Sequence, residues 1–170
     1  MVPIMERGIV HIYTGDGRGK SPVALGRAVQ AAAAGEQVVI IQFLKGKGLE
    51  DTEFVRRLEP EIKLFRFEKS DEFYEELPEE KKAEEDMNIR NGMNFAKKVL
   101  STGECNLLIL DEVLGLIEKN IISVEDVENL LNQRGETDVI LPGISLNDEI
   151  CSLADEVSKI ETLKFKTYNF

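Results

Sequence analysis

The stretch that decides the fold is Gly8–Ser21, which reads GIVHIYTGDGRGKS. The apolar run at 8–13 predicts a buried strand, and a glycine-rich loop follows it and ends in Gly-Lys-Ser. Glycines at 15, 17 and 19 let backbone N–H groups curl around an anion, and the next helix adds its positive N-terminal end. The order of strand, glycine loop and helix predicts a phosphate-binding loop.

The last residues of the loop carry the expected chemistry. The Lys20 ammonium would hold polyphosphate oxygens, and the Ser21 hydroxyl would ligate a Mg²⁺ that bridges them. The strict motif has a glycine six residues before the lysine, where this chain has Thr14. The first glycine comes one place later, at Gly15, so the loop is a compact variant. Pro22 suits the first helical turn but removes an N–H that phosphate would otherwise use.

The composition bounds the class of protein. The 170 residues predict one nucleotide-binding domain, 1–170, and contain no apolar run of the roughly 20 residues that span a bilayer. A net charge of −11 argues against a nucleic-acid partner. The first seven residues do not have the form of a signal peptide, so we expect no membrane association and a cytoplasmic location. Cys105 and Cys151 lie far apart and show no metal-site spacing.

Strand and helix signals alternate along the chain. We predict strands at 8–13, 37–43, 62–67, 106–110, 138–141 and 159–165. Helices are predicted at 22–34 and 79–100, from a capping box at Ser123, and from Asn147 with Ile150, Ala154 and Val157 on one face. This pattern predicts an α/β fold, an open and mostly parallel six-stranded sheet with helices on both faces. Ligands of such sheets bind at the carboxyl ends of the strands.

The segment 107–112, LLILDE, has the form of a Walker B element. Four apolar residues predict a central strand, and Asp111 and Glu112 follow at its carboxyl end. Magnesium on a nucleotide takes one or two carboxylates besides water and phosphate oxygens. The alternative is a strand that simply ends in acidic residues.

Four other side chains leave alternatives open. Lys45 follows the second strand at the same edge, and it either supports phosphate charge or is a solvated loop lysine. Phe73 and Tyr74 lie in an acidic segment, and they either cover a flat apolar ligand or anchor the loop. His11 lies inside the first strand, where we expect a packing residue because nothing places it beside a nucleophile.

Several segments together resemble the P-loop corrinoid adenosyltransferases of the cobalamin pathway. They are TGDGRGKS at 14–21, LGRA at 25–28, VIIQFLKG at 39–46, LILDE at 108–112 and LADEV at 153–157. The likeness runs from about residue 8 to about residue 160. A compact glycine loop followed by Gln-Phe-x-Lys-Gly is fairly specific to this family, since generic P-loop proteins share only the first feature. The chain is similar to a divergent member.

The resemblance implies a RecA-like fold, a homodimer and a reaction. In that reaction the 5′-deoxyadenosyl group of ATP passes to the Co(I) centre of a corrinoid, and triphosphate leaves. Cobalt is the nucleophile, so no nucleophilic side chain is needed, and a reduced flavoprotein is the expected electron donor. Two alternatives stay open: a non-catalytic paralogue that binds ATP or corrinoid, and a P-loop ATPase or kinase of ordinary regiochemistry.

The resemblance also assigns the site. Lys20 and Glu112 are the expected catalytic residues, and Ser21, Asp111 and Glu112 the expected ligands of Mg²⁺. Phe73 and Tyr74 fall roughly where the family places aromatics against the lower face of the corrin. The expected nucleotide-binding residues are Thr14, Gly15, Asp16, Gly17, Arg18, Gly19, Lys20, Ser21 and Lys45.

The chain departs from the family pattern in three places. Leu141-Pro142-Gly143-Ile144 stands where members usually carry Thr-Gly-Arg at the end of the fifth strand. Pro22 stands where members commonly have Ser or Thr. The seven residues before Gly8 are too few for the N-terminal helix with which many members cover the corrin. These departures bear on rate and affinity.

Overall fold

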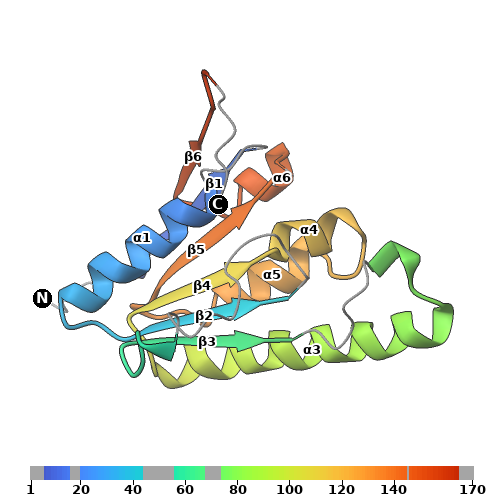
Figure 1. Ribbon diagram of the computed structural model, residues 1–170, viewed down its shortest axis with the longest axis horizontal. Coiled ribbons are helices and arrows are strands. Elements are labelled where there is room, and N and C mark those ends of the chain that lie inside the picture. Colours follow the sequence, from blue (N-terminus) through green and yellow to red (C-terminus); the bar gives the residue numbers. More distant parts are fainter. Residues whose placement is uncertain (1–5, 16–19, 44–55, 68–73, 145, 165–170) are drawn as a thin grey trace, which may run out of the picture.

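The computed structural model describes residues 6–15, 20–43, 56–67, 74–144 and 146–164 (Figure 1). Six strands form one sheet in the order β3-β2-β4-β5-β1-β6, and all five pairings between neighbours are parallel. The strands are β1 (Val10–Thr14), β2 (Val38–Gln42), β3 (Ile62–Arg66), β4 (Leu107–Asp111), β5 (Asp138–Gly143) and β6 (Glu156–Lys159).

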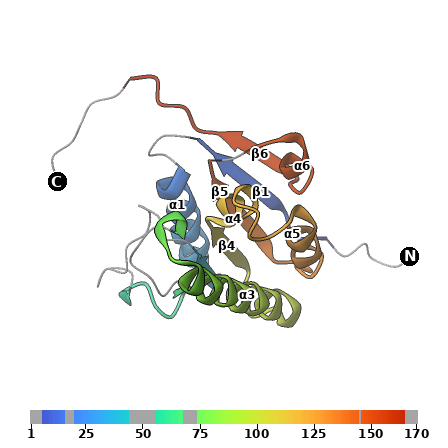
Figure 2. The ribbon, with the colours of Figure 1, turned by 90° about the vertical axis from the view of Figure 1, so that its right-hand side faces the viewer.

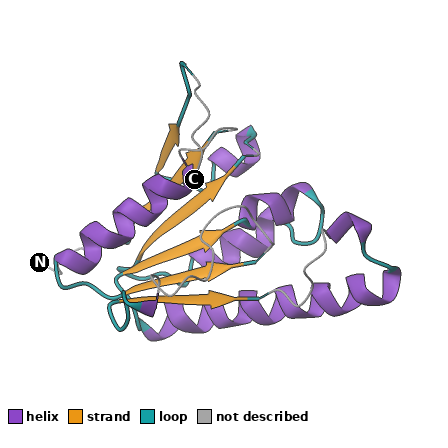
Figure 3. Cartoon of the chain, viewed as in Figure 1, coloured by secondary structure: helices purple, strands orange, loops and turns teal. Residues whose placement is uncertain are grey.

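Helices connect and cover these strands (Figure 3). They are α1 (Lys20–Ala33), the 3₁₀ turn η1 (Tyr74–Glu76), α3 (Glu79–Thr102), α4 (Val113–Glu118), α5 (Val124–Leu131) and α6 (Asp148–Cys151). Within the described ranges, no helix combines the length and the apolar character that a membrane-crossing segment requires.

The core consists of two layers, one on each face of the sheet. On one face, Ala24 and Ala28 of α1 pack with Val38 and Ile40 of β2. The alternate strand residues point to the other face, because side chains along a strand alternate in direction. There they meet α3, α4 and α5, as with Ile41, Leu108, Leu110, Ile89, Leu114 and Val127. Figure 2 shows α1 and α5 on opposite sides of the sheet. The predicted two-sided α/β sheet is confirmed.

The predicted helix starts at Ser123 and Asn147 are also confirmed. Ser123 Oγ accepts a hydrogen bond from the backbone N–H of Asp126, and the Asp126 carboxylate accepts one from the Ser123 N–H, both at 3.0 Å. Asn147 Oδ1 accepts from the N–H of Ile150 at 2.8 Å. Each cap satisfies a backbone donor that the first helical turn leaves unpaired.

The prediction for the C-terminal elements was wrong. Helix α6 ends at Cys151, and Val157 lies in β6 rather than on a helix. The last strand spans 156–159, so it ends where the predicted strand at 159–165 began. The physical reason is that Asp155 ties the chain to β1: its carboxylate accepts from the Val10 N–H, and its N–H donates to the Val10 carbonyl, both at 2.8 Å. An edge strand needs no apolar run, so its sequence carried no strand signal.

Candidate functional site

The candidate site is the carboxyl edge of the sheet. Strand β5 lies between β1 and β4, so the end of β1, where the glycine motif begins, and the acidic pair at the end of β4 lie at one edge with a single strand between them. In the register, Thr14 lies opposite Gly143, and Gln42 lies opposite Asp111. Figure 1 shows β2, β3 and β4 pointing the same way, with α4 beyond the end of β4.

The end of β1 is fixed by both of its neighbours. Thr14 is buried, and its Oγ1 donates to the Ile144 carbonyl at 3.1 Å. On the other side, the Ile160 N–H donates to the Thr14 carbonyl at 2.8 Å. Gly15 follows with φ +156°, and a Cβ there would lie 2.5 Å from the Ile160 carbonyl oxygen. The loop therefore starts from a rigid point where only glycine fits.

The end of β4 carries the two predicted carboxylates. Asp111 is 4% exposed, and its Oδ2 accepts a hydrogen bond from Gln42 Nε2 at 3.2 Å. Glu112 is the N-cap of α4 and has φ 69° and ψ 11°, the left-handed conformation. Val113 and Leu114, directly after it, are wholly buried. A left-handed conformation costs an L-residue about 1–2 kcal/mol, and such residues cluster at functional sites.

The oxygen donors at this edge fit a magnesium ion. Asp111 and Glu112 are consecutive carboxylates at the end of β4, and Ser21 is the second residue of α1. Mg²⁺ binds through oxygen, from one or two carboxylates together with phosphate and water. The chemistry of these residues is therefore suitable for Mg²⁺ on a nucleotide.

Much of the predicted nucleotide loop lies outside the described residues. Asp16, Gly17, Arg18 and Gly19 do so, as do Lys45 and Phe73. The backbone of Lys20 and Ser21 forms the start of α1, two residues before the predicted start at Pro22, while their side chains lie outside the description. The roles of these residues stay predictions.

Tyr74 is held against α3. Its hydroxyl donates to Asp86 Oδ1 at 2.7 Å, and Lys82 Nζ lies 5.6 Å from the centre of its ring. Burial, and next the hydrogen bond to Asp86, raise the pKa of Tyr74 to about 12. An ion pair between Lys119 and Glu75 adds a second tie between η1 and the rest of the fold. These contacts are those expected if Tyr74 anchors its segment to α3, which is one of the two alternatives. Contact of Tyr74 with a corrin stays a prediction.

His11 is a packing residue, as predicted. It is 8% exposed, and its ring stacks on Tyr13 with 4.0 Å between centroids. Its Nε2 lies 2.8 Å from Ser158 Oγ, and its Nδ1 lies 3.2 Å from the Glu156 carboxylate. Burial lowers the pKa of His11, and it outweighs the opposing effect of Glu156. These contacts join β1 to the edge strand β6.

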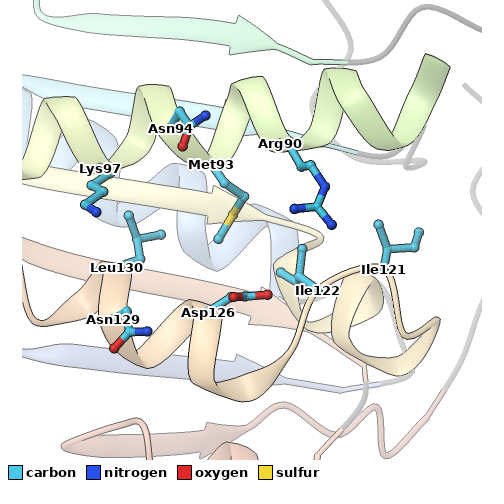
Figure 4. Close-up of a pocket in the computed structure, with 9 residues that line it drawn as sticks. All are labelled: Arg90, Met93, Asn94, Lys97, Ile121, Ile122, Asp126, Asn129 and Leu130. Atoms are coloured by element: carbon cyan, nitrogen blue, oxygen red, sulfur yellow. The ribbon is translucent and has the colours of Figure 1, made fainter. Parts of the chain in front are cut away.

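A separate groove of about 300 Å³ lies between α3 and α5 (Figure 4). Arg90 and Lys97 line it from α3, and Asp126 and Asn129 line it from α5. None of its lining residues belongs to the predicted nucleotide, magnesium or corrin residues. The groove is therefore distinct from the candidate site.

The sequence analysis missed Gln42. A signal was available, because Gln42 and Asp111 each end an otherwise apolar strand, VVIIQ and LLILD. Equivalent polar endings on two buried parallel runs predict neighbours at one edge, and the register confirms this pairing.

Comparison with known proteins shows the family of the chain. Residues 6–169 match the family model described as ATP:corrinoid adenosyltransferase BtuR/CobO/CobP. The corrinoid adenosyltransferase of Escherichia coli strain K12 is 29% identical over 160 residues, which cover 94% of this chain and 79% of that protein. Corrinoid adenosyltransferase CobA of Salmonella typhimurium strain LT2 has the same identity and coverage.

A solved structure extends the comparison to the fold. The flagellar accessory protein FlaH from Methanocaldococcus jannaschii matches with a TM-score of 0.60 and 16% identity, over 94% of this chain and 74% of that one. This likeness concerns the fold alone, which is a RecA-like α/β fold. From its sequence match over 6–169, the chain belongs to the ATP:corrinoid adenosyltransferase family.

Proposed function

We propose that this chain transfers the 5′-deoxyadenosyl group of ATP to the Co(I) centre of a corrinoid and releases triphosphate. The observation that carries the proposal is the shared edge, where the turn after β1 and the acidic pair after β4 flank β5 in a chain of this family. Of the residues resolved there, Asp111 and Glu112 have the chemistry that a magnesium nucleotide needs.

The reaction needs positioning more than reactive side chains. The cobalt electron pair forms the bond to C5′, and the bond from C5′ to the phosphate oxygen breaks, so that triphosphate leaves with the two electrons of that C–O bond. Backbone amides of the glycine loop and the Lys20 ammonium would hold the triphosphate in line with the attack. Ser21, Asp111 and Glu112 would hold Mg²⁺, which neutralises charge on the phosphates.

The proposed contacts with the corrin come from the segment around Tyr74. Tyr74 ties one end of the segment that carries Phe73 to α3, through Asp86. Phe73 and Tyr74 are proposed to contact the lower face of the corrin, and Lys45 to add positive charge near the phosphates. A homodimer, a reduced flavoprotein as electron donor and a cytoplasmic location complete the proposal.

The test uses the whole chain with MgATP and chemically reduced cobalamin. The cobalt spectrum and the phosphate product are followed together. A cobalt–carbon bond with triphosphate is the expected outcome. ADP as product would indicate ordinary P-loop regiochemistry, and ATP binding without turnover would indicate a non-catalytic paralogue. A Lys20→Ala variant serves as the control for the loop, and we expect a raised KM for ATP and a lowered kcat.

A further inference from the structure

We propose that Gln42 is a positioning residue for the magnesium end of the site, acting through Asp111. This inference rests on the proposed function and concerns how its cation is held. Gln42 Nε2 donates to Asp111 Oδ2 at 3.2 Å, between the last residues of two adjacent strands. The two residues are 3% and 4% exposed, so the contact is shielded from water.

The backbone of Gln42 is held by both neighbouring strands. Strand β2 pairs with β4 on one side and with β3 on the other, through Asp111 and Arg66 at this level. Just beyond, the Phe67 N–H donates to the Gln42 carbonyl at 2.9 Å, and the Phe43 N–H donates to the Asp111 carbonyl at 3.4 Å. The amide donor is thereby held at the end of two paired strands.

The chemistry of the amide suits this task. A carboxylate offers about four lone-pair positions, and one hydrogen bond from Gln42 sets its plane while using one of them. A lysine at this place would neutralise Asp111, and a glutamate would repel it. A neutral donor orients the carboxylate and adds no charge of its own beside it. Polar partners of this kind tune metal affinity by about 10–100-fold.

Burial supports the same reading. The other residues of β2 are apolar, VVII, and all five positions of the strand are buried. A polar amide in such a run loses its hydrogen bonds to water. Its burial is therefore unfavourable unless a protein group accepts a hydrogen bond from it. Asp111 is that partner, and it lies at the edge where the nucleotide is proposed to bind.

The test is the substitution Gln42→Met, which keeps the length of the side chain and removes its N–H donor. We expect at least a tenfold rise in the Mg²⁺ concentration that gives half-maximal adenosyl transfer, with the KM for cobalamin unchanged. Binding of Mn²⁺ with ATP, followed by electron paramagnetic resonance without any turnover, should weaken by the same factor. Conversely, wild-type affinity for the cation in a folded Gln42→Met variant would overturn the inference.

The matched control is Thr137→Val. Thr137 is also 4% exposed, and its Oγ1 donates to the Cys105 carbonyl at 2.9 Å, before the start of β5. Its loss should lower stability without changing cation affinity. If Gln42→Met does not fold, Gln42→Asn carries the test, because its shorter side chain no longer reaches Asp111. A wild-type protein that forms no adenosyl product would instead contradict the proposed function, independently of Gln42.

Discussion

The chain turns from a strand into a helix at the carboxyl edge after β1 and again after β4, and the two turns use different residues. After β1, Gly15 occupies a place where a Cβ would lie 2.5 Å from the Ile160 carbonyl oxygen. After β4, Glu112 takes a left-handed conformation, φ 69°, that glycine would adopt more easily. At Gly15 the close approach of the Ile160 backbone excludes any residue with a Cβ. At Glu112 a side chain is present despite the conformational cost, which points to the carboxylate as the useful part.

The largest effect is expected at that carboxylate. Glu112→Gln keeps the size of the side chain and removes the charge proposed to face Mg²⁺. We expect kcat/KM for adenosyl transfer to fall about 100-fold or more, as for the loss of one preorganised electrostatic group. Steady-state kinetics at several Mg²⁺ concentrations measure it. If the dependence of the rate on Mg²⁺ concentration were unchanged, Glu112 would not be a ligand of Mg²⁺. The proposed functional reason for its left-handed conformation would then be wrong.

The next effect is on folding, at the other turn. Gly15→Ala forces a methyl group against the Ile160 carbonyl, and we expect a loss of about 1–3 kcal/mol in the free energy of unfolding. Urea denaturation measures it. Gly26→Ala is the matched control, since a Cβ at that helical position meets nothing within 4 Å and alanine favours helix. Equal stability of the two variants would show that the β1 turn tolerates a side chain.

A smaller effect separates conformational cost from function at Glu112. Glu112→Gly relieves the left-handed strain, so we expect the free energy of unfolding to rise by about 0.5 kcal/mol while activity is lost. Asn120 also has positive φ, 57°, at the end of α4. Asn120→Gly should change neither quantity much, because asparagine tolerates this conformation. Thermal melts and the adenosyl-transfer assay test both variants. Retained activity in Glu112→Gly would contradict a role for the carboxylate.

The smallest effect concerns β6, the strand that leads to Ile160 beside Gly15. Burial lowers the pKa of His11 below its unfolded value of 6.5. The charge of Arg27 lowers this pKa further, while the charge of Glu156 raises it by less than burial lowers it. The unfolded chain then binds more protons in the window below pH 6.5, so stability is lost as the pH falls through it. His11→Gln should flatten this part of the stability curve, measured by urea denaturation between pH 5 and 7. Identical slopes in the two proteins would exclude His11 as the cause.

The sequence predicted the frame of the molecule well, because buried parallel strands require apolar runs. It failed at β6, where a short edge strand with a single apolar residue carries no such run, and at α4, whose apolar residues follow Asp111 and Glu112 without a break. The acidic pair was found because its position after a strand is local information.

The rest of the site depends on contacts between distant residues. Gln42 and Asp111 are 69 residues apart, and only the strand order brings them together. The conformation of Glu112 follows from the way α4 packs, which no local pattern encodes. The pairing of Tyr74 with Asp86 likewise depends on how η1 meets α3.

Gly143 gives the edge a property of its own. It brings β5 so close to α4 that a Cβ would lie 2.7 Å from the Leu114 side chain. The next residue, Ile144, receives the hydroxyl of Thr14. The end of β1 and the start of α4 are thus packed against the same strand end. A ligand that reaches both ends would meet strand ends already in place there, so it would lose less conformational entropy in ordering them.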